Sequence, residues 1–314
     1  MTDERLGGRA GGGSGTATVA RPADHAAASR RLTAWWRGWW ASRGCRPSTA
    51  PARVLSAALG LWDVAAGLLV FGGYLLVAAH VATRLDVADR YARGLYAAER
   101  WLHLAPEQAV NRWTAANPVV AALANYHYAI GYLASTLALV VWLRLAHRPN
   151  YARHVLSLLA INAVAIAAFF AWPVTPPRLL AGTVFVDTVQ THDTWGSWGT
   201  GLVSSTANQH AAMPSLHVAW ATWVAVTLIA QGAPRWLCRA AVLHIGSTTA
   251  VIVMTGNHWL VDAFAGIAVT AAVELAVVGV LRVRARNGRL GAAFGAGRGS
   301  PPAPPTPARI GGRR

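Results

Sequence analysis

Residues 255–281 read TGNHWLVDAFAGIAVTAAVELAVVGVL, a polar head followed by a long apolar run. A helix needs roughly 20 apolar residues to cross the hydrocarbon core of a bilayer, and this run meets that length. Its polar residues gather at the N-terminal end, where His258 and Asp262 stand four positions apart. The segment therefore predicts a membrane-spanning helix with reactive side chains at its N-terminal end.

Five further apolar stretches precede this one, in a chain of 314 residues that is 54% hydrophobic and only 13% charged. We predict an all-α, polytopic membrane protein with six transmembrane helices. The predicted spans are 61–83, 118–143, 154–172, 214–231, 238–256 and 259–281. Between the first two, residues 85–116 place apolar side chains at helical spacing among charged ones, which predicts an amphipathic helix on the membrane surface.

The polar segments divide the chain into four parts. Gly, Ala, Pro and Arg with no apolar period predict disorder at both ends. Trp and Arg are interleaved after the N-terminal tail, as expected of a segment that lies in the headgroup layer. The predicted parts are a disordered basic tail at 1–28, an interfacial Trp/Arg segment at 29–53, a membrane-embedded domain at 54–284 and a disordered Pro/Gly/Arg tail at 285–314.

The net charge of +16 is explained by membrane topology, so no nucleic-acid partner is needed. Arg supplies all 28 basic residues, and 22 of them lie in the two terminal segments and in the loops after the second and fourth spans. Cytoplasmic segments of membrane proteins carry such an excess. We therefore expect both termini on the cytoplasmic side of a cytoplasmic (inner) membrane, with the neutral loops outside.

Three polar motifs share the outer side, because the third and fifth spans end there and the fourth and sixth begin there. They are PVTPPR at 173–178, MPSLH at 213–217 and TGNHWLVD at 255–262. Segments far apart in the chain are thus expected to meet at one depth in the membrane, which predicts a shared site.

The third motif offers a nucleophile. On a helix, a spacing of four lets Asp262 accept one imidazole N–H of His258 and leaves the other ring nitrogen free to attack. His217 is expected about one turn into the fourth span, behind Pro214 at the first helical position and a capping Ser215.

A phosphate group fits such a site. Helix N-termini attract anions, and Arg178 can add a bidentate phosphate contact. The matching chemistry is two-step phosphoryl transfer, in which His258 attacks phosphorus, Asp262 steadies the imidazolium and His217 protonates the leaving alkoxide. The acceptor is either water, giving a phosphatase, or the hydroxyl of a lipid or polyol, giving a phosphotransferase. A loop at 179–212, long enough to cover the site, favours transfer, and the choice stays open.

These strings resemble the type 2 phosphatidic acid phosphatase superfamily over residues 60–281. Within it, PPR, AAMPSLHVAW and TGNHWLVDAFAG are similar to the inositolphosphotransferase-like branch that contains inositol phosphorylceramide synthases. The resemblance implies a six-helix bundle whose substrate is a phospholipid or a polyprenyl phosphate. It also implies that His258 is the nucleophile, that Asp262 orients it and that His217 is the acid.

The chain departs from that superfamily's usual pattern in its cationic residues. It contains no Lys, and Val251 and Ile252 stand where the superfamily usually has Ser and Arg before the final His. Phosphate binding must therefore use other groups together with the helix amides. The expected phosphate-binding residues are Arg178, Ser215, Asn257 and His210. No metal and no other cofactor is expected.

Three other functions stay open as alternatives. Polar residues inside spans, such as Glu274 and its candidate partner His244, sometimes mark a transport path. Two His and one Asp are an acceptable zinc ligand set, which would make the protein a zinc-dependent membrane hydrolase. A member of the family without turnover would only bind lipid.

Overall fold

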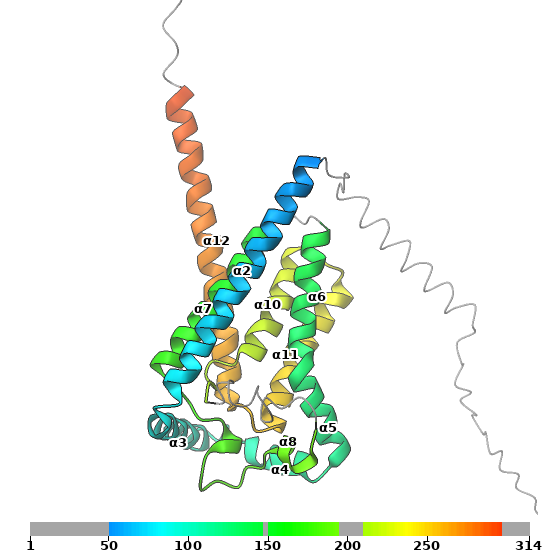
Figure 1. The fold of residues 1–314 in the computed structure, drawn as a ribbon, viewed down its shortest axis with the longest axis vertical. Coiled ribbons are helices and arrows are strands. Elements are labelled where there is room, and N and C mark those ends of the chain that lie inside the picture. The colour runs from blue at the N-terminus through cyan, green and yellow to red at the C-terminus, as the bar shows by residue number, and fades with distance from the viewer. Residues whose placement is uncertain (1–49, 147–149, 195–209, 297–314) are drawn as a thin grey trace, which may run out of the picture. The chain divides into compact units, whose positions relative to one another are not determined.

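The computed structural model describes residues 50–146, 150–194 and 210–296, and nearly all of them are helical (Figure 1). The long helices are α2 (Ala50–Val81), a continuous column of α5 (Pro118–Tyr126), η1 (His127–Gly131) and α6 (Tyr132–Leu145), then α7 (Tyr151–Ala171), α10 (Leu216–Ala230), α11 (Arg235–Met254) and α12 (Leu260–Ala296). Shorter helices are α3 (Leu85–Trp101), α4 (Glu107–Ala115), η2 (Pro177–Leu179) and α8 (Thr188–His192). The described residues form no β-strand, and Val174 and Ala211 make an isolated bridge.

Five of the helical columns are long and apolar enough to cross a membrane, which confirms the all-α, multi-pass membrane architecture. The spans are Val64–Val81, Pro118–Leu145, Tyr151–Ala171, Arg235–Met254 and Leu260–Arg284. The sixth expected span corresponds to α10, which is apolar but only 15 residues long. A length of about 20 residues is usual for a span, so six as the number of spans stays a prediction.

The last helix is longer than expected. The predicted C-terminal tail begins at residue 285, whereas α12 continues to Ala296. Ala, Leu and Arg are strong helix formers, and the first Pro after α12 begins stands at 301, so the helix passes the end of the apolar run. The predicted tail at 1–28 and the interfacial segment up to residue 49 lie outside the described residues, as do residues 297–314.

The amphipathic segment at 85–116 is confirmed as helical, but it is two helices rather than one. Helix α3 ends at Trp101, and α4 begins at Glu107. Between them His103 has a φ of 59°, and Pro106 precedes the second helix. A left-handed residue and a proline both interrupt a helix, which explains the break. Helices α3, α4 and α8 lie together at one end of the bundle, beside the start of α5 and the end of α7 (Figure 1).

Helix α10 is the central helix and contacts α6, α7, α11 and α12. Most of its residues are buried, and Trp223 is completely covered. A helix that is apolar on every side belongs in the interior, so its short, apolar sequence explains its place. Gly266 allows α12 to pack closely against the start of α10, because a Cβ at this position would lie 2.5 Å from the carbonyl oxygen of Ser215.

A polar cluster ties α7 to α12 within the membrane-spanning layer. Glu274 accepts a hydrogen bond from Arg153 at 3.0 Å and another from the Ser157 hydroxyl at 2.6 Å. The expected alternative partner, His244, instead lies 3.0 Å from the Ser135 hydroxyl. An ion pair with hydrogen bonds to both carboxylate oxygens is the arrangement that makes a buried acid tolerable in a membrane.

Candidate active site

The three polar motifs meet at one place, as their positions in the chain predicted. The amide of Arg178 donates to the Gly256 carbonyl at 3.0 Å, and the amide of Ser215 donates to the Asp262 carbonyl at 3.0 Å. The indole of Trp259 donates to the Thr175 carbonyl at 3.0 Å. These hydrogen bonds thus join the loop after α7, the start of α10 and the segment that leads into α12.

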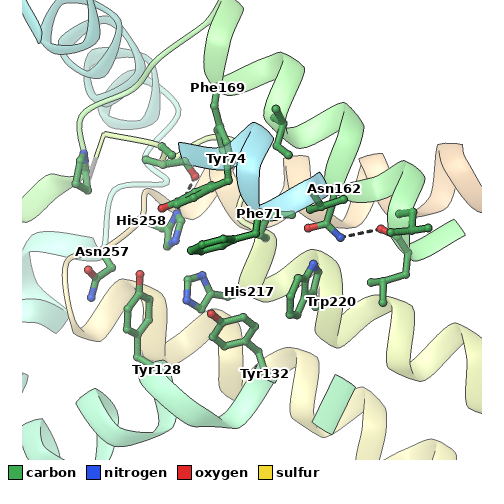
Figure 2. A pocket seen from close by; sticks show the side chains of 18 of the residues that line it. Phe71, Tyr74, Tyr128, Tyr132, Asn162, Phe169, His217, Trp220, Asn257 and His258 are labelled. Atoms are coloured by element: carbon green, nitrogen blue, oxygen red, sulfur yellow. Dashed lines mark hydrogen bonds between the residues drawn. The ribbon is translucent and has the colours of Figure 1, made fainter. Parts of the chain in front are cut away.

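A cavity of about 380 Å³ opens at this junction (Figure 2). His217, His258, Arg178 and Asn257 line it, and the other lining residues come from α2, η1, α6, α7, α10 and the loop after α7. Three predicted motifs therefore contribute side chains to a single pocket.

His217 and His258 face each other across the pocket. Their ring centroids are 5.3 Å apart, and the ring planes meet at 67°. His217 is the second residue of α10, so it lies closer to the helix N-terminus than the predicted full turn, and Pro214 precedes the helix rather than opening it. Both imidazoles line the same pocket, so a single substrate group in it can contact the two rings.

The ring of His258 is held mainly by a backbone carbonyl. Its Nδ1 lies 2.7 Å from the carbonyl oxygen of Ala212 and 3.4 Å from Oδ2 of Asp262. The expectation that both residues lie on one helix is wrong, because α12 begins only at Leu260. Gly256, with a φ of 65°, turns the chain after α11 and places His258 ahead of the next helix.

Asp262 is completely buried and serves the helix start as well as His258. Its Oδ2 accepts the amide N–H of Trp259 at 2.9 Å. A carboxylate in the first turn is favoured by the helix dipole and by the unpaired amides there. The side chain therefore fixes the turn that carries His258 and places a negative charge beside its ring.

Arg178 is clamped rather than loose. Its Nε donates to Oδ1 of Asn257 at 2.8 Å, and one terminal nitrogen donates to Oδ2 of Asp187 at 2.8 Å. Asp187 in turn caps α8 by accepting the amides of Val189 and Gln190. The motifs predicted the guanidinium and Asn257 but not Asp187, because a lone acid in a long loop belongs to no motif.

Two other expected phosphate-binding residues lie differently. Ser215 stands at the N-cap of α10, yet its hydroxyl makes no cap hydrogen bond, and its backbone amide donates to the Asp262 carbonyl. The His210 ring lies 3.2 Å from the Thr175 hydroxyl. Burial lowers the pKa of His210, an effect that Asp89 opposes and Arg178 reinforces. Neither residue lines the pocket, and their contact with phosphate stays a prediction.

Residues 93–276 match the PAP2 superfamily, and this range covers more than half of the chain. The chain belongs to the PAP2 superfamily. The matched range contains all three motifs, and the superfamily includes phosphatases and related phosphotransferases. Members of the superfamily act on lipid phosphates in membranes, so this chain is a membrane protein whose family acts on phosphate esters. No curated protein and no solved structure gave a significant match to the chain.

Two tyrosines of this PAP2 protein, which belong to none of the predicted motifs, contact His217. The Tyr128 ring stacks on it with centroids 4.2 Å apart and planes at 21°, and the Tyr132 ring lies 4.1 Å away (Figure 2). The π-helical turn η1 starts at His127 and brings both onto the pocket side of the column. π-turns often occur at functional sites, but an apolar span gives no sequence signal for one.

The PAP2 pocket continues from the histidines along the membrane-spanning helices. Its other walls are apolar side chains of α2 and α7, together with Asn162 and Trp220 (Figure 2). The apolar lining residues of α2 and α7 are Val70, Phe71, Leu158, Leu159, Ile166 and Phe169. A pocket with cationic and imidazole groups at one end and apolar walls at the other suits a phosphate ester with a hydrocarbon tail.

Proposed function

We propose that this protein is a lipid phosphate phosphatase or phosphotransferase that works through a phosphohistidine intermediate on His258. The facing pair of His217 and His258 in the pocket with Arg178 carries the proposal. The PAP2 membership supports the reaction class.

The hydrogen bond to Ala212 identifies the attacking atom. A carbonyl oxygen only accepts, so Nδ1 of His258 carries the ring proton and donates it at 2.7 Å. Nε2 then keeps its lone pair and attacks phosphorus. The negative charge of Asp262, 3.4 Å from Nδ1, stabilises the positive charge that the ring acquires as the N–P bond forms.

His217 acts as the general acid in the first step and as the general base in the second. As the bond between phosphorus and the ester oxygen breaks, protonated His217 gives its proton to that oxygen, and the lipid alcohol leaves. In the second step neutral His217 takes the proton of the acceptor hydroxyl, whose oxygen attacks the phosphohistidine and releases His258. The cycle returns both imidazoles to their starting protonation states.

Positive potential at the phosphate comes from two sources. Arg178 is held rigidly by Asn257 and Asp187, so its charge needs no reorganisation during the reaction. The second source is the N-terminal end of α10, whose second residue, His217, lines the pocket. In the proposed reaction Ser215 and His210 assist phosphate binding, and no metal takes part.

The proposal also covers the acceptor of the phosphoryl group and the class of lipid substrate. The motif strings favour an inositolphosphotransferase-like enzyme, in which a polyol or lipid hydroxyl replaces water. The substrate is a phospholipid or a polyprenyl phosphate, whose chain lies along the apolar walls of α2 and α7.

We place the protein in the cytoplasmic membrane with both termini inside and the pocket at the outer face. The Arg-rich loops support this orientation, since they lie at the bundle end opposite α3, α4 and α8 (Figure 1). In this proposal residues 54–284 form the catalytic domain, and the basic segments at either end lie inside the cell.

Product analysis tests the function. Purified protein in detergent is given phosphate-labelled lipids, with and without inositol or a lipid alcohol, beside His258→Asn. The control His103→Asn changes an exposed histidine whose left-handed backbone Asn tolerates. Free phosphate that depends on His258 indicates a phosphatase, and label in a new lipid indicates a transferase. Equal turnover by wild type and His258→Asn would refute the proposal.

A further inference from the structure

The first amides of α12 are bonded to carboxylates from two other helices. The amide of Leu260 donates to Oε1 of Glu107 at 3.0 Å, and the amide of Val261 donates to Oε1 of Glu99 at 2.9 Å. Glu99 belongs to α3 and Glu107 to α4. Hydrogen bonds from α3 and α4 therefore hold the N-terminal turn of α12, which lies beside His258.

Both acids are deeply buried, with Glu99 5% exposed and Glu107 not exposed at all. Their second oxygens, Oε2 of each, have no hydrogen-bond donor among the residues that the structure describes. A buried oxygen without a donor is costly, and two buried carboxylates in one place repel. A single proton on the pair removes both problems, because one carboxyl group can then donate its O–H to the other.

The charges around Glu99 agree with a bound proton. The titratable groups that face it are Glu107 of α4 and Asp262 of α12, and both are acidic. Its neighbour Arg100 lies over the ring of Tyr96 instead. Burial, followed by the two nearby acids and the hydrogen bond with Glu107, raises the pKa of Glu99 to about 8 despite the opposing amide of Val261.

We propose that Glu99 and Glu107 are positioning residues of the active site, which share one proton and hold the first turn of α12 in the geometry that the reaction needs. This inference rests on the proposed function of His258 and Asp262. Neither glutamate lines the pocket or touches a reacting atom.

The two glutamates influence His258 and His217 through contacts of the first turn of α12. Asp262 lies in the same turn, and its Oδ2 is 3.4 Å from Nδ1 of His258. Its backbone carbonyl accepts the amide of Ser215, at the start of the helix that carries His217. A shift of the turn thus displaces both imidazoles relative to each other, and a displacement of about 1 Å can slow an enzyme about a hundredfold.

Glutamine substitution separates the proton from the charge. In Glu99→Gln the amide oxygen can still accept from Val261, and the amide N–H₂ can donate to Glu107, so the variant copies the protonated acid permanently. Glu99→Leu removes both contacts. Glu107→Gln is the reciprocal test, and Asp86→Asn, on the exposed surface of the same helix, is the matched control.

The activity readout is kcat and KM for a labelled lipid phosphate between about pH 6 and pH 10. We expect Glu99→Leu to lose about tenfold or more in kcat with little change in KM, because the pocket is untouched. We expect Glu99→Gln to keep near wild-type kcat at pH 7 and to exceed wild type above pH 8, where wild type loses the shared proton. Wild-type kcat in Glu99→Leu, or identical alkaline profiles in wild type and Glu99→Gln, would overturn the inference.

Thermal unfolding in detergent gives a second readout that needs no turnover. The pKa of Glu99 is raised in the folded protein, so the stability that its proton provides is complete below about pH 4.5 and is lost as pH rises to about 8. The Tm of Glu99→Gln minus that of wild type should therefore grow between about pH 5 and pH 8 and then level off. A pH-independent difference refutes the shared proton even if His258-dependent turnover is never found, whereas absent turnover alone counts against the proposed function.

Discussion

The tautomer of His258 depends on a backbone carbonyl more than on a side chain. Its Nδ1 is 2.7 Å from the Ala212 carbonyl and 3.4 Å from Asp262. Where a carboxylate alone sets the tautomer of a catalytic histidine, replacing it by the amide costs about 10⁴ in kcat. Here the carbonyl keeps the proton on Nδ1 after the carboxylate is gone.

Asp262→Asn should therefore be milder than the usual loss of an orienting acid. We expect kcat to fall by about 10- to 100-fold, because the stabilising charge disappears while the tautomer survives. Turnover of the variant would be compared with His258→Asn and with the control Asp193→Asn in the exposed turn after α8. A loss as large as that of His258→Asn would show that Asp262, and not Ala212, sets the tautomer.

Tyr128 should act through its ring. Tyr128→Phe keeps the stacking on His217 at 4.2 Å, whereas Tyr128→Leu removes it. We expect a change of less than about fivefold in kcat for Phe and a loss of about tenfold or more for Leu, because neither ring nitrogen of His217 has a hydrogen-bond partner in the described structure. Tyr126→Leu, on the exposed side of the same column, is the control. Equal losses for Phe and Leu would assign the effect to the hydroxyl.

At this scale the sequence predicted the groups with chemistry but not their supports. His217, His258, Arg178 and Asn257 do line one pocket, because motif spacing and membrane depth placed them together. Asp187 and Tyr128 were missed, since a loop acid and a tyrosine in an apolar span follow no period. The partner of His258 Nδ1 was also missed, because a backbone carbonyl leaves no trace in sequence.

The crossing of α10 and α12 depends on one glycine. A Cβ on Gly266 would lie 2.5 Å from the Ser215 carbonyl oxygen and 3.2 Å from the Ala219 amide nitrogen, both backbone atoms that cannot rotate away. The same substitution at Gly279, on the same helix, meets nothing within 4 Å.

Gly266→Ala should lower the free energy of unfolding by about 1–3 kcal/mol through overpacking and should also reduce kcat, because His217 lies beside the displaced turn. Gly279→Ala should be neutral or slightly stabilising. Thermal unfolding and turnover of both variants check this. Equal behaviour of the two variants would mean that the helices do not approach so closely at Gly266.

The helical elements were largely predictable, and their ends were not. Apolar runs predicted the spans to within a few residues, since length and hydropathy are local properties. The break at His103 and the π-turn at η1 depend on backbone geometry, and the extension of α12 to Ala296 follows helix propensity beyond the end of the apolar run. The start of α12 at Leu260 matters most, because it moved His258 off the helix.

The whole molecule has an asymmetric distribution of Arg, and the proposed orientation in the membrane rests on it. The end of α6 and the starts of α7 and α11, which carry Arg144, Arg153 and Arg235, lie at one end of the bundle, and the layer of α3 and α4 lies at the other (Figure 1). This asymmetry was readable from the sequence, whereas the number of spans was not settled by it, because α10 is only 15 residues long.

Thiol labelling tests the orientation. In a chain with Cys45 and Cys238 replaced by Ala, Asp86→Cys on α3 should react with a membrane-impermeant reagent in intact cells. Arg239→Cys, exposed near the start of α11, should react only after the membrane is opened. The reverse pattern would place the pocket on the cytoplasmic side.

The most direct test of the central claim is to trap the covalent intermediate. Protein mixed briefly with a lipid labelled in its phosphate is denatured, and the bound label is followed in acid and in alkali. We predict bound phosphate that survives alkali and is lost in acid, as a phosphorus–nitrogen bond requires, and none in His258→Asn. Label that persists in His258→Asn, or turnover with no protein-bound label, would contradict the account.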